Sequence, residues 1–318
     1  MILQPPSVLL AGPSGSGKTC SIATQLLCGL RVFVVVTEPD GVASLLDHAE
    51  RIKAPIDMLH WAYCPPKGAD WMALDDMYTK VNSLDQKGLA DMRDLGKSAF
   101  RDAGRKFLNA FRNFHCDRTN QDFGDFTTWG DNCSMNVDSL TGWSMIAWGL
   151  TVGYKPTANP GEWGIAQNVI ANHLNKINSD RQCFFNLTCH VEKEVDDMTG
   201  AKKVMVSTIG AKLAPKIPPF FSEFVRCSRV LDVKTGAASF TWSTVASDMD
   251  LKNRALPMSA TMPADFKPVV DAYRRRIRLA GASPTPPVQP TPGTTTTKPD
   301  PVMPSAPMSP TPASPKWT

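Results

Sequence analysis

The sequence predicts an α/β fold in which helices flank a mostly parallel central sheet. Residues 7–11 form a short apolar run, a glycine-rich loop follows it, and residues 20–30 carry apolar side chains at helical spacing. Residues 31–37 then form a β-branched run that is typical of a strand covered on both faces. This order of strand, loop, helix and buried strand is typical of parallel sheets with helices outside them.

The spacing within the glycine-rich loop points to phosphate binding. Residues 12–19, GPSGSGKT, fit the pattern G-x-x-x-x-G-K-[ST], whose backbone N–H groups surround the phosphates of a nucleotide. We expect Lys18 to reach the β and γ phosphates of ATP and the Thr19 hydroxyl to coordinate Mg²⁺. The alternative is a glycine turn without a ligand. The predicted nucleotide-binding residues are Gly12, Pro13, Ser14, Gly15, Ser16, Gly17, Lys18, Thr19 and Cys20.

Composition limits the class of protein. With 318 residues, 42% of them hydrophobic, the chain can bury a large core. The formal net charge of +4 indicates no overall attraction to nucleic acid, so any basic surface would be a local patch. The eight cysteines form no C-x-x-C pair, and we expect neither zinc nor disulfides. No apolar stretch is as long as a membrane span and no signal peptide is apparent, so we expect a reducing cytoplasm and no membrane partner.

The second strand ends in an acid. Glu38 follows the run of residues 31–37, and open α/β sheets place their ligands at the carboxyl ends of their strands. We expect Glu38 to lie beside the γ phosphate and to polarise the attacking water. The alternative is that Glu38 is a turn acid or a cap for a helix at residues 42–51.

A long polar segment follows. Residues 69–114 have a helical pattern in which one apolar stripe is formed by Trp71, Leu74, Met77, Tyr78 and Val81. We therefore expect a helical insertion.

A second acid is expected at the end of another strand, where it would hold Mg²⁺ through the water shell of the ion. Residues 133–139 form that strand, which is unusually polar because it contains Ser134 and Asn136. Asp138 is the better candidate for the Mg²⁺-linked acid, and Asp131 is its rival.

A third strand carries a polar residue at its end. After helical patterns at residues 140–152 and 163–179, residues 183–189 form a buried strand that ends at His190. His190 is either a group that contacts the γ phosphate and reports its hydrolysis, or a structural histidine.

The remaining segments are more irregular. Residues 191–208 predict a β-hairpin, and residues 210–219, with Lys212 and Lys216, are too rich in glycine and proline for regular structure. Residues 220–231 return to the core, residues 239–245 predict a last strand, and residues 263–279 predict a helix. From residue 281 onward proline, threonine and serine dominate, so we expect an ATPase domain over residues 1–280 and a disordered tail over residues 281–318.

Together these motifs resemble the RecA-like ATPases of phages, which include AAA-domain nucleotide-binding proteins and single-strand annealing proteins. The resemblance covers roughly residues 5 to 260. It rests on the loop at residues 12–19, Glu38, Asp138-Ser139, Trp163-Gly164 and Thr188-Cys189-His190. The polar strand before Asp138 and the large insertion depart from the family pattern.

The resemblance implies a RecA-type core that hydrolyses ATP with Mg²⁺, often as a homo-oligomer on single-stranded DNA. By position, Lys18 and Thr19 match the residues that bind phosphate and Mg²⁺. Glu38 matches the catalytic glutamate, Asp138 the Mg²⁺-linked aspartate and His190 the sensor.

The resulting hypothesis is a phage ATPase of DNA recombination or single-strand annealing in the host cytoplasm. ATP would lie between neighbouring subunits, with Lys252 or Arg254 of the next subunit near the γ phosphate. Lys212 and Lys216 would contact DNA, and the tail would bind other phage recombination or replication proteins. The alternatives are an ATPase of phage replication or packaging, and an ATP-binding assembly module with little turnover.

Overall fold

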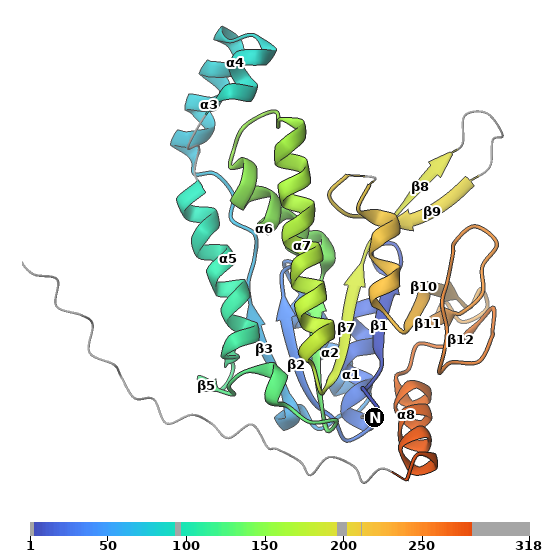
Figure 1. Cartoon of the computed structure of the whole chain (residues 1–318). Coiled ribbons are helices and arrows are strands. Elements are labelled where there is room, and N and C mark those ends of the chain that lie inside the picture. Colours follow the sequence, from blue (N-terminus) through green and yellow to red (C-terminus); the bar gives the residue numbers. More distant parts are fainter. Residues whose placement is uncertain (1–2, 93–96, 196–201, 211, 282–318) are drawn as a thin grey trace, which may run out of the picture.

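A mostly parallel sheet forms the centre of the protein in the computed structural model, which describes residues 3–92, 97–195, 202–210 and 212–281 (Figure 1). Its strand order is β12-β11-β10-β1-β7-β6-β2-β3. The strands from β10 to β3 in this order are parallel to their neighbours, whereas β11 and β12 are antiparallel. The bounds are β1 (Ser7–Ala11), β2 (Arg31–Val36), β3 (Leu59–Tyr63), β6 (Cys133–Asp138), β7 (Phe184–Cys189), β10 (Glu223–Leu231), β11 (Ala238–Ser243) and β12 (Met262–Pro263).

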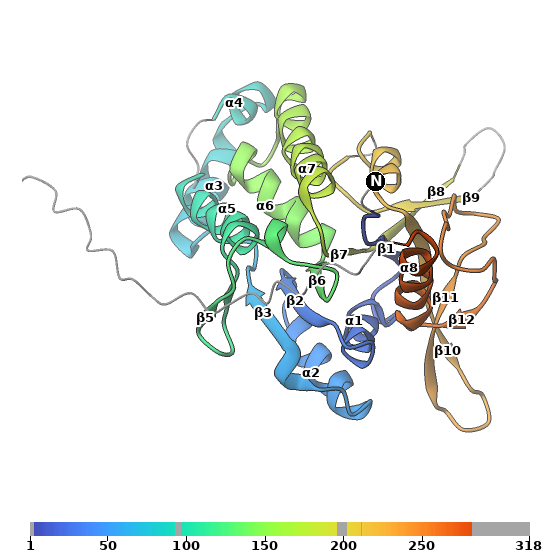
Figure 2. The ribbon, with the colours of Figure 1, turned by 60° about the horizontal axis from the view of Figure 1, so that its bottom comes forward.

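Helices cover both faces of this sheet, which confirms the predicted fold class. In Figure 2, α5, α6 and α7 lie on one face, and α1, α2 and α8 lie on the other. The helices are α1 (Lys18–Leu27), α2 (Gly41–Arg51), α3 (Trp71–Ser83), α4 (Gln86–Asp91), α5 (Lys97–Arg112), α6 (Leu140–Val152), α7 (Pro160–Asp180) and α8 (Lys267–Leu279).

After Arg31, strand β2 is apolar because both of its faces are covered. Its side chains alternate between the two faces of the sheet. Val34 packs in the core beneath α1, α2 and α8, whereas Phe33 and Val35 pack in the core beneath α5, α6 and α7. Both sets are fully buried, so a β-branched run without polar alternation is what this position requires.

The polar side chains of β6 are also buried, and they form a hydrogen-bonded network. The Asn136 side chain accepts from the Gln25 amide of α1 at 2.9 Å and from the Asn186 amide of β7 at 3.0 Å. Ser134 accepts from the same Asn186 amide at 3.0 Å. The network links α1, β6 and β7, and it explains how a buried strand can contain these residues.

The predicted insertion is helical, but its apolar stripe does not pack into the core. Phe107 and Phe111 of α5 are buried against the sheet, whereas no residue of α3 is buried. The Trp71 side chain is 87% exposed and Tyr78 is 65% exposed. The insertion therefore packs on the core through α5 and not through the predicted apolar stripe.

Several shorter elements complete the fold. The predicted hairpin is a separate two-stranded sheet of β8 (Val191–Val195) and β9 (Lys202–Val206), and β4 (His115–Cys116) pairs with β5 (Gln121–Asp122). Single 3₁₀ turns occupy Ile56–Met58, Phe126–Thr128, Ala214–Lys216 and Pro218–Phe220.

Three features of the chain differ from the sequence prediction or lie beyond the structure. The prediction missed β3 entirely, and the segment expected only to return to the core is the nine-residue strand β10. The predicted tail lies outside the described residues except for its first residue, Gly281. Across the described ranges, no helix combines the length and apolar character needed to cross a bilayer.

Candidate functional site

The glycine-rich loop lies between β1 and α1, at the carboxyl end of the parallel sheet. Gly12 has no room for a side chain, because an added Cβ would overlap the backbone carbonyl oxygen of Cys227 in β10. Gly17 has φ +82°, and an added Cβ would overlap the ring of Phe240 in β11. Both glycines are therefore required by the fold.

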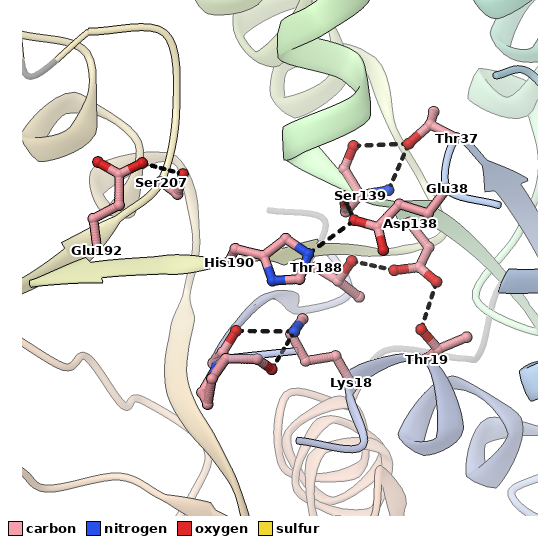
Figure 3. A network of polar contacts seen from close by, with 12 residues as sticks. Lys18, Thr19, Thr37, Glu38, Asp138, Ser139, Thr188, His190, Glu192 and Ser207 are labelled. Carbon is pink, nitrogen blue, oxygen red and sulfur yellow. Dashed lines mark hydrogen bonds and ion pairs between the residues drawn. The ribbon is translucent and has the colours of Figure 1, made fainter. Parts of the chain in front are cut away.

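Lys18 and Thr19 begin α1 directly after the loop. The Lys18 ammonium donates hydrogen bonds to the carbonyl oxygens of Gly12 and Pro13, both at 2.9 Å, and the residue is 6% exposed. The Thr19 hydroxyl donates to the Asp138 carboxylate at 2.7 Å. The loop, the helix and the end of β6 thus meet at one point (Figure 3).

Asp138 is buried at the end of β6. One carboxylate oxygen accepts from Thr19, and the other accepts from the Thr188 hydroxyl of β7. Burial raises the pKa of Asp138, and the two hydroxyl hydrogen bonds oppose that rise. Asp131, the rival acid, precedes β6 and accepts from the Tyr273 hydroxyl at 3.3 Å instead. Only Asp138 lies beside Thr19.

The residues present fit a magnesium ion. Mg²⁺ prefers oxygen ligands and is commonly held by one or two carboxylates, with water and substrate phosphates completing its octahedron. The Thr19 hydroxyl and the Asp138 carboxylate, 2.7 Å apart, are oxygen donors of this kind.

Glu38 directly follows Thr37 at the end of β2 and faces His190 at the end of β7. The Nε2 atom of His190 lies 3.1 Å from one carboxylate oxygen of Glu38, and the Ser139 hydroxyl donates to the same oxygen. These side chains are accessible, with Glu38 32% exposed and His190 26% exposed. The hydrogen bond from His190 is the largest cause of a lowered pKa of Glu38, which burial opposes.

A cleft of about 240 Å³ opens onto these groups. It brings together residues 14–20 of the loop and α1, Glu38 and His190. Gly12 and Pro13 do not line it, but their carbonyls hold Lys18. Cys20 lies at its edge, and burial raises the pKa of that thiol.

Sequence reasoning assigned no individual role to four residues of this site, although Ser139 and Thr188 stand in the motifs that carry the resemblance. Ser139 and Thr188 hold the two acids, and the Thr37 hydroxyl accepts from the backbone N–H of Ser139 at 2.8 Å. Their positions beside Glu38, Asp138 and His190 in the sequence were the available signal. Phe240 lines the cleft from β11, and no sequence pattern places that strand over the loop.

The predicted trans-acting residues do not line the cleft. Lys252 pairs with Phe224, which in turn pairs with Leu9, in the middle of β1. The backbone N–H of Arg254 donates to the Glu223 carboxylate at 2.9 Å. Both residues therefore lie toward the amino ends of the strands, away from the loop of the same subunit.

Lys212 and Lys216 are exposed on the segment between β9 and β10. This segment begins beside the site, because the backbone N–H of Ser207 donates to the His190 carbonyl at 2.8 Å. The contact gives a physical connection between His190 and the irregular segment.

Comparison with known proteins yields only distant likenesses. No protein-family model matches the chain, and no curated protein matches it. An ATPase from the type III secretion system of pathogenic bacteria is 10% identical with a TM-score of 0.37, covering 72% of this chain and 51% of its own. This chain therefore spans about half of that ATPase.

Two further solved structures give similar values. The flagellar accessory protein FlaH from Methanocaldococcus jannaschii is 9% identical with a TM-score of 0.32, covering 81% of this chain and 90% of its own. The RadB recombinase is 12% identical with a TM-score of 0.33, covering 79% of this chain and 92% of its own. Likenesses at this level assign neither a family nor an activity, so the function must be argued from the site itself.

Proposed function

We propose that this chain is a Mg²⁺-dependent RecA-like ATPase. The observation that carries the proposal is the meeting of three strand ends around one phosphate-binding loop: Glu38 from β2, Asp138 from β6 and His190 after β7. A purely structural glycine turn would not require a buried carboxylate beside Thr19 or a half-buried acid beside a histidine.

Each residue has a distinct task in this proposal. The loop N–H groups and Lys18 bind the phosphates, which requires Lys18 to exchange its carbonyl partners for phosphate oxygens. Thr19 and Asp138 would hold Mg²⁺, which would neutralise charge on the phosphate oxygens. Glu38 orients the attacking water and accepts its proton, since the hydrogen bonds from His190 and Ser139 keep it ionised and fix its direction.

The wider role is a further part of the proposal. We infer an oligomeric phage protein that acts on single-stranded DNA in recombination or annealing in the host cytoplasm. Support comes from the sequence resemblance, the exposed Lys212 and Lys216, and their link to His190 through Ser207. Lys252 and Arg254 are proposed to act on the nucleotide of a neighbouring subunit, since they do not reach the cleft of their own.

An ATPase assay with and without single-stranded DNA tests this function. We expect turnover that requires Mg²⁺ and increases with DNA. DNA-independent turnover would favour an ATPase of replication or packaging, and nucleotide binding without turnover would favour an assembly module. Absence of both binding and turnover would refute the ATPase proposal.

A further inference from the structure

A second cavity, of about 420 Å³, lies at the opposite end of the strands from the phosphate-binding loop. Its walls include Gln4 and Ser7 at the beginning of β1, Phe221 before β10 and Arg181 after α7. The remaining walls come from Tyr273 and Arg276 of α8 and from the segment with Lys252 and Arg254. In Figure 1 this is the region where the start of β1 lies near α8, and the Tyr273 hydroxyl donates to the Leu3 carbonyl oxygen at 3.3 Å.

The most unusual group in this cavity is Arg181, a cation that is only 5% exposed. Its guanidinium donates to the carbonyl oxygens of Pro5 and Cys183 and, at 3.4 Å, to the Asn178 side chain. No ion pair within the described ranges includes Arg181. A buried charge is costly unless it is paired, so this site favours the arrival of an anion.

A second observation also points to a ligand. The side-chain Nδ2 of Asn178, a lining residue, is buried and has no hydrogen-bond partner in the described part of the chain. Buried amide donors are normally satisfied, so this one marks an incomplete hydrogen-bond network in the wall of the cavity.

The other charges around the cavity have the same sign. Lys252, Arg254 and Arg276 line it together with Arg181, and no aspartate or glutamate is among the described lining residues. The nearby carboxylate of Glu223 accepts from the backbone N–H groups of residues 254–256. The negative charge of Glu223 also acts on Arg276 and Lys252. With this one carboxylate against four lining cations, the charge around the cavity stays positive.

We propose that this cavity binds a phosphate group, carried either by a small phosphate ester or by a nucleic-acid strand. Arginine donors in a fixed fork match phosphate oxygens, and the cavity volume suits a ligand of nucleotide size. Lys252 and Arg254 are also the proposed trans-acting residues, so the inference is tested in a chain whose own phosphate-binding loop is impaired, which separates its failure from failure of the ATPase proposal.

The test measures binding of inorganic pyrophosphate by calorimetry to the full chain with Lys18→Ala, without Mg²⁺, so that the loop of every subunit is impaired. We expect saturable binding that weakens at least about tenfold when Lys252→Ala and Arg276→Ala are added, since each substitution removes a charge-assisted hydrogen bond to the phosphate. The matched control adds Arg275→Ala and Arg278→Ala, two exposed cations of the same helix region that do not line the cavity. The control should change affinity less than about twofold, the size of effect that screened surface charge produces.

Labelling of Lys252 with an amine reagent gives a second readout that needs no change in the cavity. Pyrophosphate should slow labelling of Lys252 and leave exposed Lys234 unaffected. Displacement of pyrophosphate by a single-stranded oligonucleotide would identify nucleic acid as the carrier, and failure of displacement would identify a small ester. Absence of pyrophosphate binding, or equal weakening in the cavity variant and its control, would overturn the proposal.

Discussion

Glu38 combines accessibility with a carboxylate that stays ionised. The hydrogen bond from His190 lowers its pKa more than burial raises it. A carboxyl group whose pKa is lowered by folding stabilises the fold above its unfolded pKa, and that contribution is lost as the pH falls through its folded pKa. Glu38 is therefore charged, and able to accept a proton, throughout the neutral range.

Glu38→Gln should separate binding from hydrolysis. Glutamine keeps the shape of the side chain but cannot accept a proton. We therefore expect turnover to fall at least about tenfold, as a minimum for the loss of a general base. Nucleotide affinity should persist, because Glu38 does not belong to the loop. Measured ATP binding and turnover of the variant decide this, and unchanged turnover with reduced melting temperature would make Glu38 a structural acid.

The pH at which turnover falls on the acidic side gives a second test of Glu38. His190→Ala removes the largest cause of the lowered pKa, so the pH at which turnover falls should move upward. If the pH at which turnover falls is unchanged in the variant while the overall rate drops, His190 does not set the pKa of Glu38.

Asp138 shows the opposite balance, because its burial disfavours the charge that the proposed Mg²⁺ site requires. Its pKa is raised by burial, so the folded state disfavours the ionised form. Asp138 therefore destabilises the fold above its folded pKa, and that cost is lost as the pH falls through the folded pKa toward the unfolded value. Asp138→Asn removes the buried charge, so we expect a higher melting temperature at pH 7 and loss of Mg²⁺-dependent turnover.

A thermal-shift series with and without Mg²⁺ and ATP tests this prediction. The ligands should raise the melting temperature of the wild-type protein and have little effect on Asp138→Asn. An unaltered response to Mg²⁺ in the variant would exclude Asp138 from the metal site.

At the scale of elements, the site is assembled by strand order. Residues 38, 138 and 190 are distant in the sequence, but β2, β6 and β7 are consecutive in the sheet and parallel, so their carboxyl ends share one edge. The apolar runs and their terminal acids could be predicted from sequence. The hydrogen-bonded network of Asn136 and Asn186 could not be predicted, because each of these buried polar side chains needs a hydrogen-bond partner on another element.

The segment between β9 and β10 carries the predicted contact with DNA. Lysines act mainly on phosphates, so Lys212→Ala/Lys216→Ala should weaken single-stranded DNA binding for all sequences and reduce the salt dependence. Basal ATPase activity should persist.

A salt series of binding measurements checks this against a control. Lys87→Ala/Lys267→Ala removes two exposed lysines from α4 and α8 and should leave the affinity and its salt slope nearly unchanged. Equal behaviour of the two double variants would remove residues 212 and 216 from the DNA-binding surface.

At the scale of the whole molecule, the sequence predicted most of the sheet but not its edges. Strands β1, β2, β6 and β7 have long buried runs, whereas β3 contains His60 and Trp61 and gives little periodic signal. Phe240 contacts the loop because β10 and β11 join the sheet beside β1. Such long-range strand pairing leaves no local pattern in the sequence. The exposed stripe of α3 shows that helical spacing of apolar residues does not by itself imply burial.

Within the described part of the chain, the buried residues form three hydrophobic clusters that all precede the end of α8. Truncation of residues 282–318 should therefore leave the melting temperature and ATPase rate unchanged, because a segment so rich in proline and poor in apolar residues adds little to a core. Circular dichroism melting of the truncated protein checks this. A fall of several degrees would show that the tail packs on the domain.

The central claim, that one loop and three strand ends form an ATPase centre, is tested most directly by phosphate release from ATP by Lys18→Ala beside the wild-type protein. Lys18 is the only lysine or arginine among the described residues that line the cleft, so the variant should lose turnover and most nucleotide affinity. The melting temperature should confirm that the variant is folded. Wild-type hydrolysis by folded Lys18→Ala would contradict the account.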